Sequence, residues 1–495
     1  MEFGDFQTPT ALAERVCGLL ADRGLRPAGV LEPTCGTGTF LHAASNAFPS
    51  SKRILGFEIN PRYVAEAQHL LRTSFPTADA QVRRADFFRM DWDEVLAGLP
   101  RPLLILGNPP WVTSAELGSL GSSNLPEKTN FNRHRGIDAL TGKSNFDISE
   151  WMLMRALEWI DGQKASLALL CKVSVARKVL RHAWKHGQRL RNAEMRRIDA
   201  LRHFGASVDA CLFVVSGSPH RGEVECAVYD TLEATYPSSR FGLRRGDLVA
   251  DLKSYDKWEH LAGPQRYRWR SGVKHDCAKV MELHPSGPGL YMNGLQEEVA
   301  LEPRFLFPML KSSELANGNV SVPSRWMLVT QSAIGEDTAR IQSAAPRTWR
   351  YLCAHAGRLD RRRSTIYRNR PRFSVFGVGS YTFAPWRVAV SGFYKKLDFR
   401  VVGSFEDKPI VLDDTCYFVP CGSKAEAVVV RDLLHSEPAQ GLLSAFVFWD
   451  SKRPVTVGLL RRLDLLAVAR EVGADAELSS FLDGPCPAGD QLRFW

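Results

Sequence analysis

The alternation of strand-like and helix-like segments over the first 220 residues constrains the fold more than any other feature of the sequence. Short runs rich in Leu, Val and Ile alternate with longer segments whose apolar residues repeat at helical spacing. The predicted strands are 29–31, 53–57, 80–84, 103–106 and 166–171, and the predicted helices are 11–23, 40–47, 61–73 and 149–160. This order and spacing predict an α/β fold built on a doubly wound, Rossmann-like parallel sheet.

The residue pattern and the composition change in the later part of the chain. From about residue 220 the alternation weakens, and Trp, Tyr, Phe, Arg and Pro become denser. Residues 1–150 hold 15 Lys+Arg against 17 Asp+Glu, which leaves 49 against 37 in residues 151–495. We therefore expect two domains, 1–219 and 220–495, the second of mixed α+β structure. Its basic excess favours a polyanionic partner.

Three further observations narrow the class of protein. The ten cysteines show no close pairing, so neither a disulfide scaffold nor a zinc ribbon is expected. No run reaches 18 apolar residues, so no membrane span is predicted. The acidic first residues lack the apolar run of a signal peptide. These features favour a soluble cytoplasmic protein without a bound metal.

The loops after the first three predicted strands carry a ligand-binding pattern. Segment 32–40 joins a strand to a helix, and its Gly36 and Gly38 allow the backbone to approach a ligand closely. The second strand leads into Glu58, whose carboxylate can accept ribose hydroxyls, and the third leads into Asp86 and Phe87. Each loop taken alone is compatible with an ordinary turn. Ligands of open α/β sheets, however, bind where all three loops converge.

The fourth predicted strand ends in the tetrapeptide Asn108-Pro109-Pro110-Trp111. The two prolines fix the backbone and leave carbonyls without competing N–H groups, and Asn108 adds an uncharged acceptor. Such a cluster can accept both protons of an exocyclic amino group, while Trp111 offers a face on which a planar ring can stack. A rigid turn with a core tryptophan is the structural alternative. The segment 112–146 that follows is rich in Gly, Ser and basic residues and is expected to be a mobile loop.

Taken together, these segments resemble the motifs of S-adenosylmethionine-dependent DNA adenine-N6 methyltransferases of the gamma arrangement, in which the cofactor motifs precede a target-recognition domain. The resemblance covers residues 5–216. It implies cofactor contacts from Thr8, Glu32, Pro33, Cys35, Gly36, Gly38, Glu58, Ile59, Asp86, Phe87 and Asn108. It implies catalytic roles for Asn108, Pro109, Pro110 and Trp111, with Phe204 as a second aromatic side chain against the base. Tyr is the more usual fourth residue of the tetrapeptide, so Trp111 departs from the family's pattern.

The resemblance implies site-specific methylation of adenine N6 in double-stranded DNA, after the base has been flipped out of the duplex. The implied cofactor is S-adenosyl-L-methionine. The implied partners are duplex DNA and a cognate restriction endonuclease or another defence-system subunit, with the protein in the cytoplasm and associated with the nucleoid. Three alternatives stay open: cytosine-N4 methylation, methylation of a protein glutamine or an RNA amino group, and DNA binding by an inactive methyltransferase fold.

The most basic stretch of the second domain is expected to contact DNA. Residues 347–372 hold nine arginines against one acidic residue, Asp360. Arginine interleaved with aromatic residues suits phosphate clamping and base-edge reading, although a β-structured core away from DNA is the alternative. The DNA-binding residues predicted here are Arg361, Arg362, Arg363, Arg368, Arg370 and Arg372, together with Lys395, Lys396 and, in the loop after the tetrapeptide, Lys143.

Overall fold

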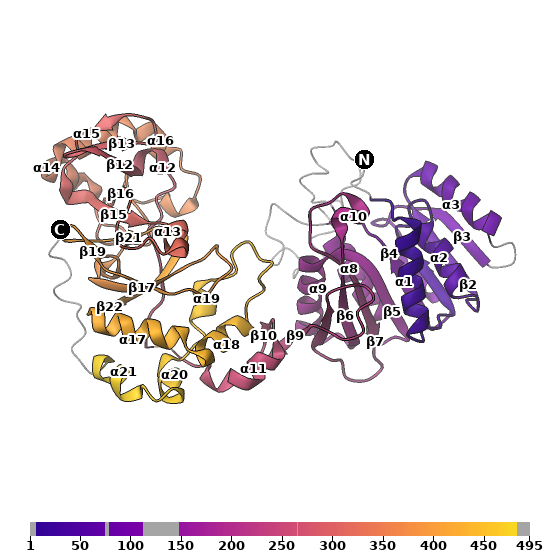
Figure 1. The fold of residues 1–495 in the computed structure, drawn as a ribbon. Helices are drawn as coiled ribbons and strands as arrows, with labels where there is room; N and C mark the ends of the chain where they lie inside the picture. The colour runs from indigo at the N-terminus through magenta and orange to yellow at the C-terminus, as the bar shows by residue number, and fades with distance from the viewer. Residues whose placement is uncertain (1–5, 75–78, 112–147, 265, 483–495) are drawn as a thin grey trace. The chain divides into compact units, whose positions relative to one another are not determined.

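The computed structural model describes residues 6–74, 79–111, 148–264 and 266–482, and the chain divides into two compact units, Met1–Leu252 and Lys253–Trp495 (Figure 1). We call them unit 1 and unit 2. The predicted loop 112–146, with Lys143, lies outside the described residues. The division falls later than the predicted boundary at residue 219. The reason is that β8 (Glu225–Tyr229), β9 (Ser239–Arg244) and β10 (Asp247–Val249) extend the sheet of unit 1.

Unit 1 is built on a ten-stranded sheet in the order β10-β9-β8-β6-β7-β5-β4-β1-β2-β3. Its other strands are β1 (Gly29–Glu32), β2 (Arg53–Glu58), β3 (Asp79–Arg84), β4 (Leu103–Gly107), β5 (Ala165–Lys172), β6 (Leu190–Ile198) and β7 (Ala210–Gly217). Strands β1 to β5 pair in parallel with one another, whereas β7 lies antiparallel between β5 and β6. Beyond them β8 is parallel to β6, and β9 and β10 are antiparallel to their neighbours.

The helices of unit 1 pack in two groups. α1 packs on α2 and α2 on α3, whereas α8 packs on α9. The helices are α1 (Thr10–Asp22), α2 (Thr39–Ala47), α3 (Pro61–Ser74), α4 (Trp92–Ala97), α8 (Ile148–Ile160), α9 (Val173–Lys185) and α10 (Ala200–Phe204). α1 buries Leu12, Val16 and Leu20, whose four-residue spacing places them on one face. Every strand and helix predicted above is present with each end within one residue, and the Rossmann-like α/β fold is confirmed.

The winding of the sheet changes direction at β1. Strand β2 pairs with β1 on one side and β4 pairs with it on the other, both in parallel. All residues of β1 and β4 are buried, as expected for the centre of a parallel sheet. The loops that leave β1 and β4 therefore diverge at the carboxyl edge of the sheet, which is where open α/β sheets bind ligands.

Unit 2 has the predicted mixed α+β structure. Its sheets have the orders β14-β13-β12-β16-β15-β21 and β11-β22-β17-β18, and β19 pairs with β20. The strands are β11 (Arg270–Ser271), β12 (Glu282–Gly287), β13 (Leu290–Asn293), β14 (Glu298–Val299), β15 (Leu306–Leu310), β16 (Arg325–Leu328), β17 (Trp386–Ser391), β18 (Arg400–Val402), β19 (Ser404–Phe405), β20 (Lys408–Pro409), β21 (Val411–Leu412) and β22 (Cys416–Cys421). The helices from residue 252 onward are α11 (Leu252–Trp258), α12 (Ala278–Met281), α13 (Ser312–Asn317), α14 (Ile341–Ala344), α15 (Pro346–Ala354), α16 (Ala356–Asp360), α17 (Lys424–His435), α18 (Glu437–Ala445), α19 (Val457–Leu460), α20 (Leu465–Glu471) and α21 (Asp475–Leu482). Within the described ranges, no helix is both long and apolar enough to cross a membrane.

A buried carboxylate ties several elements of unit 2 together. Glu282, at the start of β12, accepts from Lys311 Nζ at 2.6 Å and lies 3.4 Å from Arg325 Nη1 on β16. His275 Nε2 is 3.2 Å from the same carboxylate, and its Nδ1 accepts from the Cys277 N–H, so Nε2 carries the proton. Burial alone would raise the pKa of Glu282, but the hydrogen bonds from His275 and Lys311 outweigh burial and lower the pKa to about 2.

Replacing Glu282 by Gln should lower the free energy of unfolding by about 3 kcal/mol at neutral pH, because Lys311 and Arg325 lose their shared counter-charge. A depressed carboxyl pKa adds stability above the unfolded value and loses it as the pH falls. The difference between wild type and variant should therefore shrink between about pH 5 and about pH 2. Denaturant titrations across that range measure it, with Glu298→Gln, an exposed carboxylate on β14, as the control. A difference that stays constant with pH would contradict the assignment.

Candidate active site

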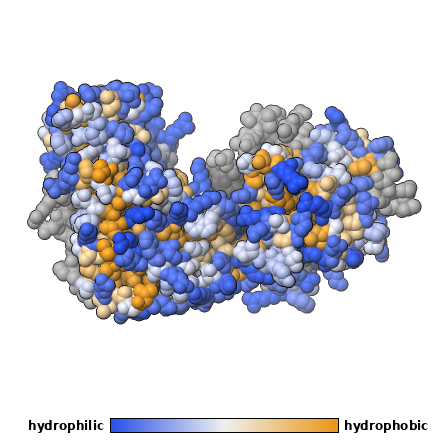
Figure 2. Space-filling view, viewed as in Figure 1, coloured by the Kyte–Doolittle hydropathy of each residue, from blue (hydrophilic) through white to orange (hydrophobic). Residues whose placement is uncertain are grey.

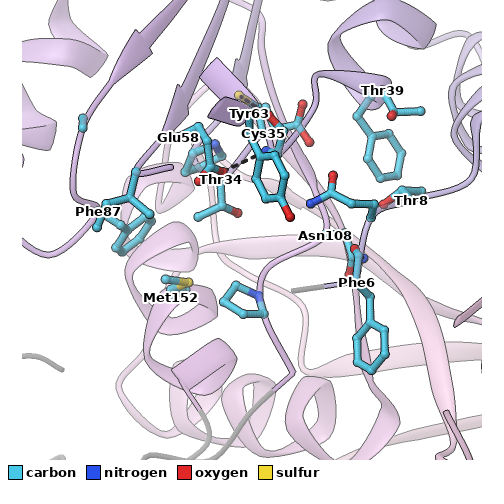
Figure 3. A pocket seen from close by; sticks show the side chains of 18 of the residues that line it. Phe6, Thr8, Thr34, Cys35, Thr39, Glu58, Tyr63, Phe87, Asn108 and Met152 are labelled. Carbon is cyan, nitrogen blue, oxygen red and sulfur yellow. Dashed lines mark hydrogen bonds between the residues drawn. The ribbon is translucent and has the colours of Figure 1, made fainter. Parts of the chain in front are cut away.

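A pocket lies at the carboxyl ends of β1, β2, β3 and β4, where the winding of the sheet changes direction (Figure 3). The segment before α1 and the first turns of α8 complete its wall. Of the residues predicted to bind cofactor or act in catalysis, those that line it are Thr8, Glu32, Pro33, Cys35, Gly36, Glu58, Ile59, Phe87, Asn108 and Pro110. Gly38, Asp86, Pro109, Trp111 and Phe204 are not part of its lining.

The glycine-containing loop after β1 has the backbone conformation that its sequence predicts. Gly36 has φ +51° and Gly38, which caps α2, has φ +84°. Both values lie in the left-handed region that favours glycine. Gln7 packs against this loop, because its Oε1 accepts from the Thr37 backbone N–H at 3.2 Å. A Cβ atom on Gly36 would lie 2.6 Å from the same Oε1. The glycine therefore lets the N-terminal segment lie directly on the loop.

Glu58 is held at the end of β2 by backbone donors. Its Oε2 accepts from the Gly36 N–H at 3.0 Å, the contact drawn in Figure 3, and its Oε1 accepts from the Asn60 N–H at 2.8 Å. These bonds fix the carboxylate in the wall of the pocket. The predicted placement of an acid at this strand end is therefore observed.

Glu32, the last residue of β1, is an unusual buried acid. Its side chain is 2% exposed, and among the described residues its Oε2 has no hydrogen-bond partner. Burial raises the pKa of Glu32 well above its usual value, and the nearby charge of Glu58 raises it further. Two carboxylates in one largely enclosed pocket favour a ligand that carries positive charge, since such a ligand would supply the missing partner.

Aromatic side chains form the wall of the pocket that follows β3. Phe87 lines the pocket and packs on Trp92 and Trp159, with ring centroids at 5.0 and 5.8 Å. Asp86 has a local role instead, because its Oδ1 accepts from the Phe88 N–H at 2.9 Å and so closes the turn. The predicted acid–aromatic pair is present, but the aromatic side chain rather than the acid forms the wall.

Asn108 stands at the end of β4 with its amide oriented by the N-terminal segment. Its Nδ2 donates to the main-chain oxygen of Phe6 at 3.0 Å. Its Oδ1 is buried and has no hydrogen-bond partner among the described residues. Figure 3 shows Asn108 and Phe6 side by side at one end of the pocket. An oriented, unpartnered acceptor at this position is suited to binding an amino group.

Trp111 and Phe204, which the sequence predicts as a pair, pack against each other, and the Phe6 ring contacts both. Their ring centroids are 5.1 Å apart with an edge-on geometry. Trp111 is only 4% exposed, its Nε1 donates to the Leu170 oxygen at 3.3 Å, and the Phe6 ring contacts it with centroids 5.8 Å apart. The face predicted to receive a base is therefore covered in this structure.

Several lining residues were not predicted from the sequence. Tyr63 comes from the first turn of α3, and Ile148 and Met152 come from α8. No local motif marks the α8 residues, because only the packing of α8 on the sheet brings them to the pocket. Phe6 directly precedes the segment Gln7-Thr8-Pro9, which resembles the N-terminal motif of the family, so its proximity to that motif was the available signal.

The predicted DNA-binding residues of unit 2 fall into two groups. Arg361, Arg363, Arg368, Arg370, Lys395 and Lys396 are exposed. Arg362 is half-buried, and its Nη1 donates to the main-chain oxygens of Ser374 at 2.7 Å and His275 at 3.2 Å. Arg372 pairs with Asp360 at 2.7 Å. The guanidinium of Arg362 therefore joins segments of the fold, and that of Arg372 already has a counter-charge.

A Rossmann-like sheet with acidic strand ends around a pocket is the arrangement expected above for a methyltransferase. The chain belongs to the type II methyltransferases. It is 42% identical over 476 residues to the type II methyltransferase M.NspV of Nostoc sp., an alignment that covers 95% of this chain and 98% of the relative. A shorter match, 34% identical over 110 residues, covers 22% of this chain and 25% of the type II methyltransferase M.CvrRI of Paramecium bursaria Chlorella virus XZ-6E. No family model matches the chain.

The fold is also similar to a solved structure, that of the type IIL restriction-modification enzyme MmeI in complex with DNA. The TM-score is 0.52 with 13% sequence identity, and the match covers 97% of this chain and 68% of MmeI. At that identity the likeness concerns the fold alone.

Proposed function

We propose that the protein is a site-specific DNA methyltransferase that transfers a methyl group from S-adenosyl-L-methionine to N6 of adenine, within a restriction-modification or related defence system. The observation that carries the proposal is the oriented, unpartnered Oδ1 of Asn108 beside a pocket with two carboxylates. The relative M.NspV is named as a type II methyltransferase, and MmeI was solved with DNA. The proposal also includes a cognate endonuclease or another defence subunit as a partner, and a location at the nucleoid.

The residues of the pocket fit the proposed cofactor. S-adenosylmethionine carries a sulfonium and an ammonium charge, and Glu32 and Glu58 offer two carboxylates to meet them or the ribose hydroxyls. The apolar and aromatic side chains of Ile59 and Phe87 suit an adenine ring. When bound, this group supplies an activated methyl on sulfur. Asp86 has a smaller part in this proposal than the sequence predicted, because its carboxylate closes the turn after β3.

The tetrapeptide would act on the amino group of the target base. Asn108 Oδ1 and the Pro109 carbonyl would accept the two amino protons, which fixes the nitrogen and turns its lone pair out of conjugation with the ring. A cofactor held by Glu32 and Glu58 would supply the methyl group to this nitrogen: the methyl–sulfur bond would break as the methyl–nitrogen bond forms, S-adenosylhomocysteine would leave, and the nitrogen would release one proton. No general base is required, so positioning and electrostatics carry most of the rate enhancement. The initial Asn of the tetrapeptide favours adenine over cytosine, whose N4 methyltransferases more often have Ser there.

Unit 2 would hold the DNA. Arg361, Arg363, Arg368 and Arg370 are exposed on the segment after α16, and Lys395 and Lys396 are exposed between β17 and β18. Figure 2 shows hydrophilic residues over the upper part of the visible face of unit 2 and hydrophobic residues over much of its lower part. Exposed cations of this kind suit phosphate contacts, which supply affinity without sequence choice. Arg362 and Arg372 have partners within unit 2, so we leave them out of the proposed DNA contacts.

The affinity for S-adenosylmethionine should fall as the pH is lowered from alkaline to acid values, because burial raises the pKa of Glu32 and the proton that it takes up cancels its charge. Glu32→Gln should bind the cofactor more weakly at the upper pH and show a flatter dependence. Calorimetric titration of both proteins at several pH values measures the effect. The exposed carboxylate variant Glu66→Gln is the control. Equal pH dependence in wild type and Glu32→Gln would contradict the role of Glu32.

Asn108→Ala should reduce methyl transfer to DNA by about 100-fold or more, since the variant loses an acceptor aimed at the reacting amino group. Cofactor affinity should stay close to that of wild type, because Glu32 and Glu58 remain. Transfer of labelled methyl groups to DNA and cofactor titration measure the two quantities separately. Turnover near that of wild type would contradict the proposed function, as would wild type that methylates only cytosine.

The double variant Arg361→Ala/Arg363→Ala should flatten the salt dependence of DNA binding by about 2 in the slope of log K against log salt, since each phosphate contact contributes about 0.9. Binding should weaken alike on cognate and non-cognate DNA. The matched control removes two other exposed arginines of unit 2, Arg304→Ala/Arg470→Ala, and should leave the slope near that of wild type. An unchanged slope in the first variant would place Arg361 and Arg363 away from the nucleic acid.

A further inference from the structure

Phe6 makes two separate contacts with the residues proposed to act on the target base. Its main-chain oxygen accepts from Asn108 Nδ2 at 3.0 Å. Its ring contacts Trp111 and Phe204, with centroids at 5.8 and 5.9 Å. The inference below rests on the proposed function, because it concerns how that same site receives its base.

The main-chain contact decides which end of the Asn108 amide faces the substrate. A carbonyl oxygen can only accept, so Phe6 O selects the NH₂ end of the amide. The Oδ1 end must then point the other way, where it is buried and has no partner among the described residues. A base amino group is a donor and needs that acceptor. If the Asn108 amide were flipped, its NH₂ group would face the amino group of the base, and two hydrogen-bond donors would meet.

The ring contact bears on access to Trp111. Trp111 is 4% exposed within a cluster of buried side chains against which Phe6 and Phe204 pack, so a base cannot stack on it until a neighbouring side chain moves. Trp111 itself is anchored, since Nε1 donates to the Leu170 oxygen and its own main-chain oxygen accepts from Lys172 Nζ at 2.9 Å. Phe204 closes α10, which ends in a left-handed cap at Gly205. Phe6 lies outside any helix or strand, ahead of α1, and a change of its side-chain torsion moves the ring without moving the main-chain oxygen.

We propose that Phe6 is a positioning residue for the target base. Its main-chain oxygen fixes the amide of Asn108 in the acceptor orientation, and its ring, which packs at a 55° tilt against Trp111, helps to cover Trp111 until the flipped base takes its place. The exchange replaces one aromatic contact with another, so Trp111 stays covered by an apolar face before and after the base binds. Because binding competes with the resident ring, the apparent affinity for DNA is reduced by the fraction of molecules in which Phe6 covers Trp111.

Two substitutions separate the ring from the main chain. Phe6→Ala removes the ring and keeps a restricted backbone, whereas Phe6→Gly removes the ring and frees the backbone as well. Both should lower the KM for DNA severalfold. Both should also raise the fluorescence of 2-aminopurine placed at the adenine that wild type methylates. Only Phe6→Gly should lower kcat severalfold, because the Asn108 amide is then less firmly oriented. Phe6→Tyr, which keeps the ring, should behave like wild type.

The measurements are steady-state methylation, 2-aminopurine fluorescence in the bound complex and cofactor affinity for all four proteins. Unfolding temperatures close to that of wild type in all four proteins separate the proposed effect from a loss of folding, and cofactor affinity reports any change that substitution of Phe6, a lining residue, causes in the pocket itself. An unchanged or raised KM for DNA with unchanged fluorescence in Phe6→Ala would overturn the inference while the proposed function stands. Equal kcat in the Ala and Gly variants would overturn the part assigned to the main-chain oxygen. Wild type that methylates no DNA would overturn both the inference and the proposed function.

Discussion

The parallel pairing of β1 with both β2 and β4 is the constraint on which the rest of unit 1 depends. It brings the last residue of β1, Glu32, to the same edge as the loop after β4. The approach is close: a Cβ on Gly107 would lie 3.1 Å from Glu32 Cγ. The buried acid and the oriented amide of Asn108 are therefore neighbours because the two strands share one ladder, although they are far apart in the chain. The proposed cofactor and base sites would share one edge of the sheet because of that ladder.

The features that the sequence predicted well are those with local signals. Apolar periodicity marked the helices and strands of the sheet core, and two glycines marked the loop after β1, where positive φ angles are found. The acids and aromatic side chains at the strand ends could be assigned to one edge because parallel strands all point the same way. This is why Glu32, Glu58, Phe87 and Asn108 line one pocket, as expected.

The features that were missed depend on tertiary contacts. Met152 reaches the pocket only through the packing of α8, and β8 to β10 belong to unit 1 only because β8 pairs with β6. The arginine-rich segment shows that the role of a charged residue also depends on tertiary contacts that the sequence does not reveal. A run of cations predicts a polyanion surface, but it does not distinguish Arg361, which is exposed, from Arg362, which donates to main-chain oxygens of the fold. Periodicity and composition carry no information about such partners.

The segment just before α1, which contains Phe6 and Gln7, limits how mutations can alter this enzyme. Gln7 holds the loop that follows β1, and Phe6, one peptide bond earlier, holds the amide at the end of β4. A single inserted or deleted residue here would shift both contacts in the same direction, so adaptation of one binding site would be felt at once by the other. Under the proposed function, a change in this stretch would affect both sites, so a redesign of the loop after β1 would have to rebuild the contact with Asn108 at the same time.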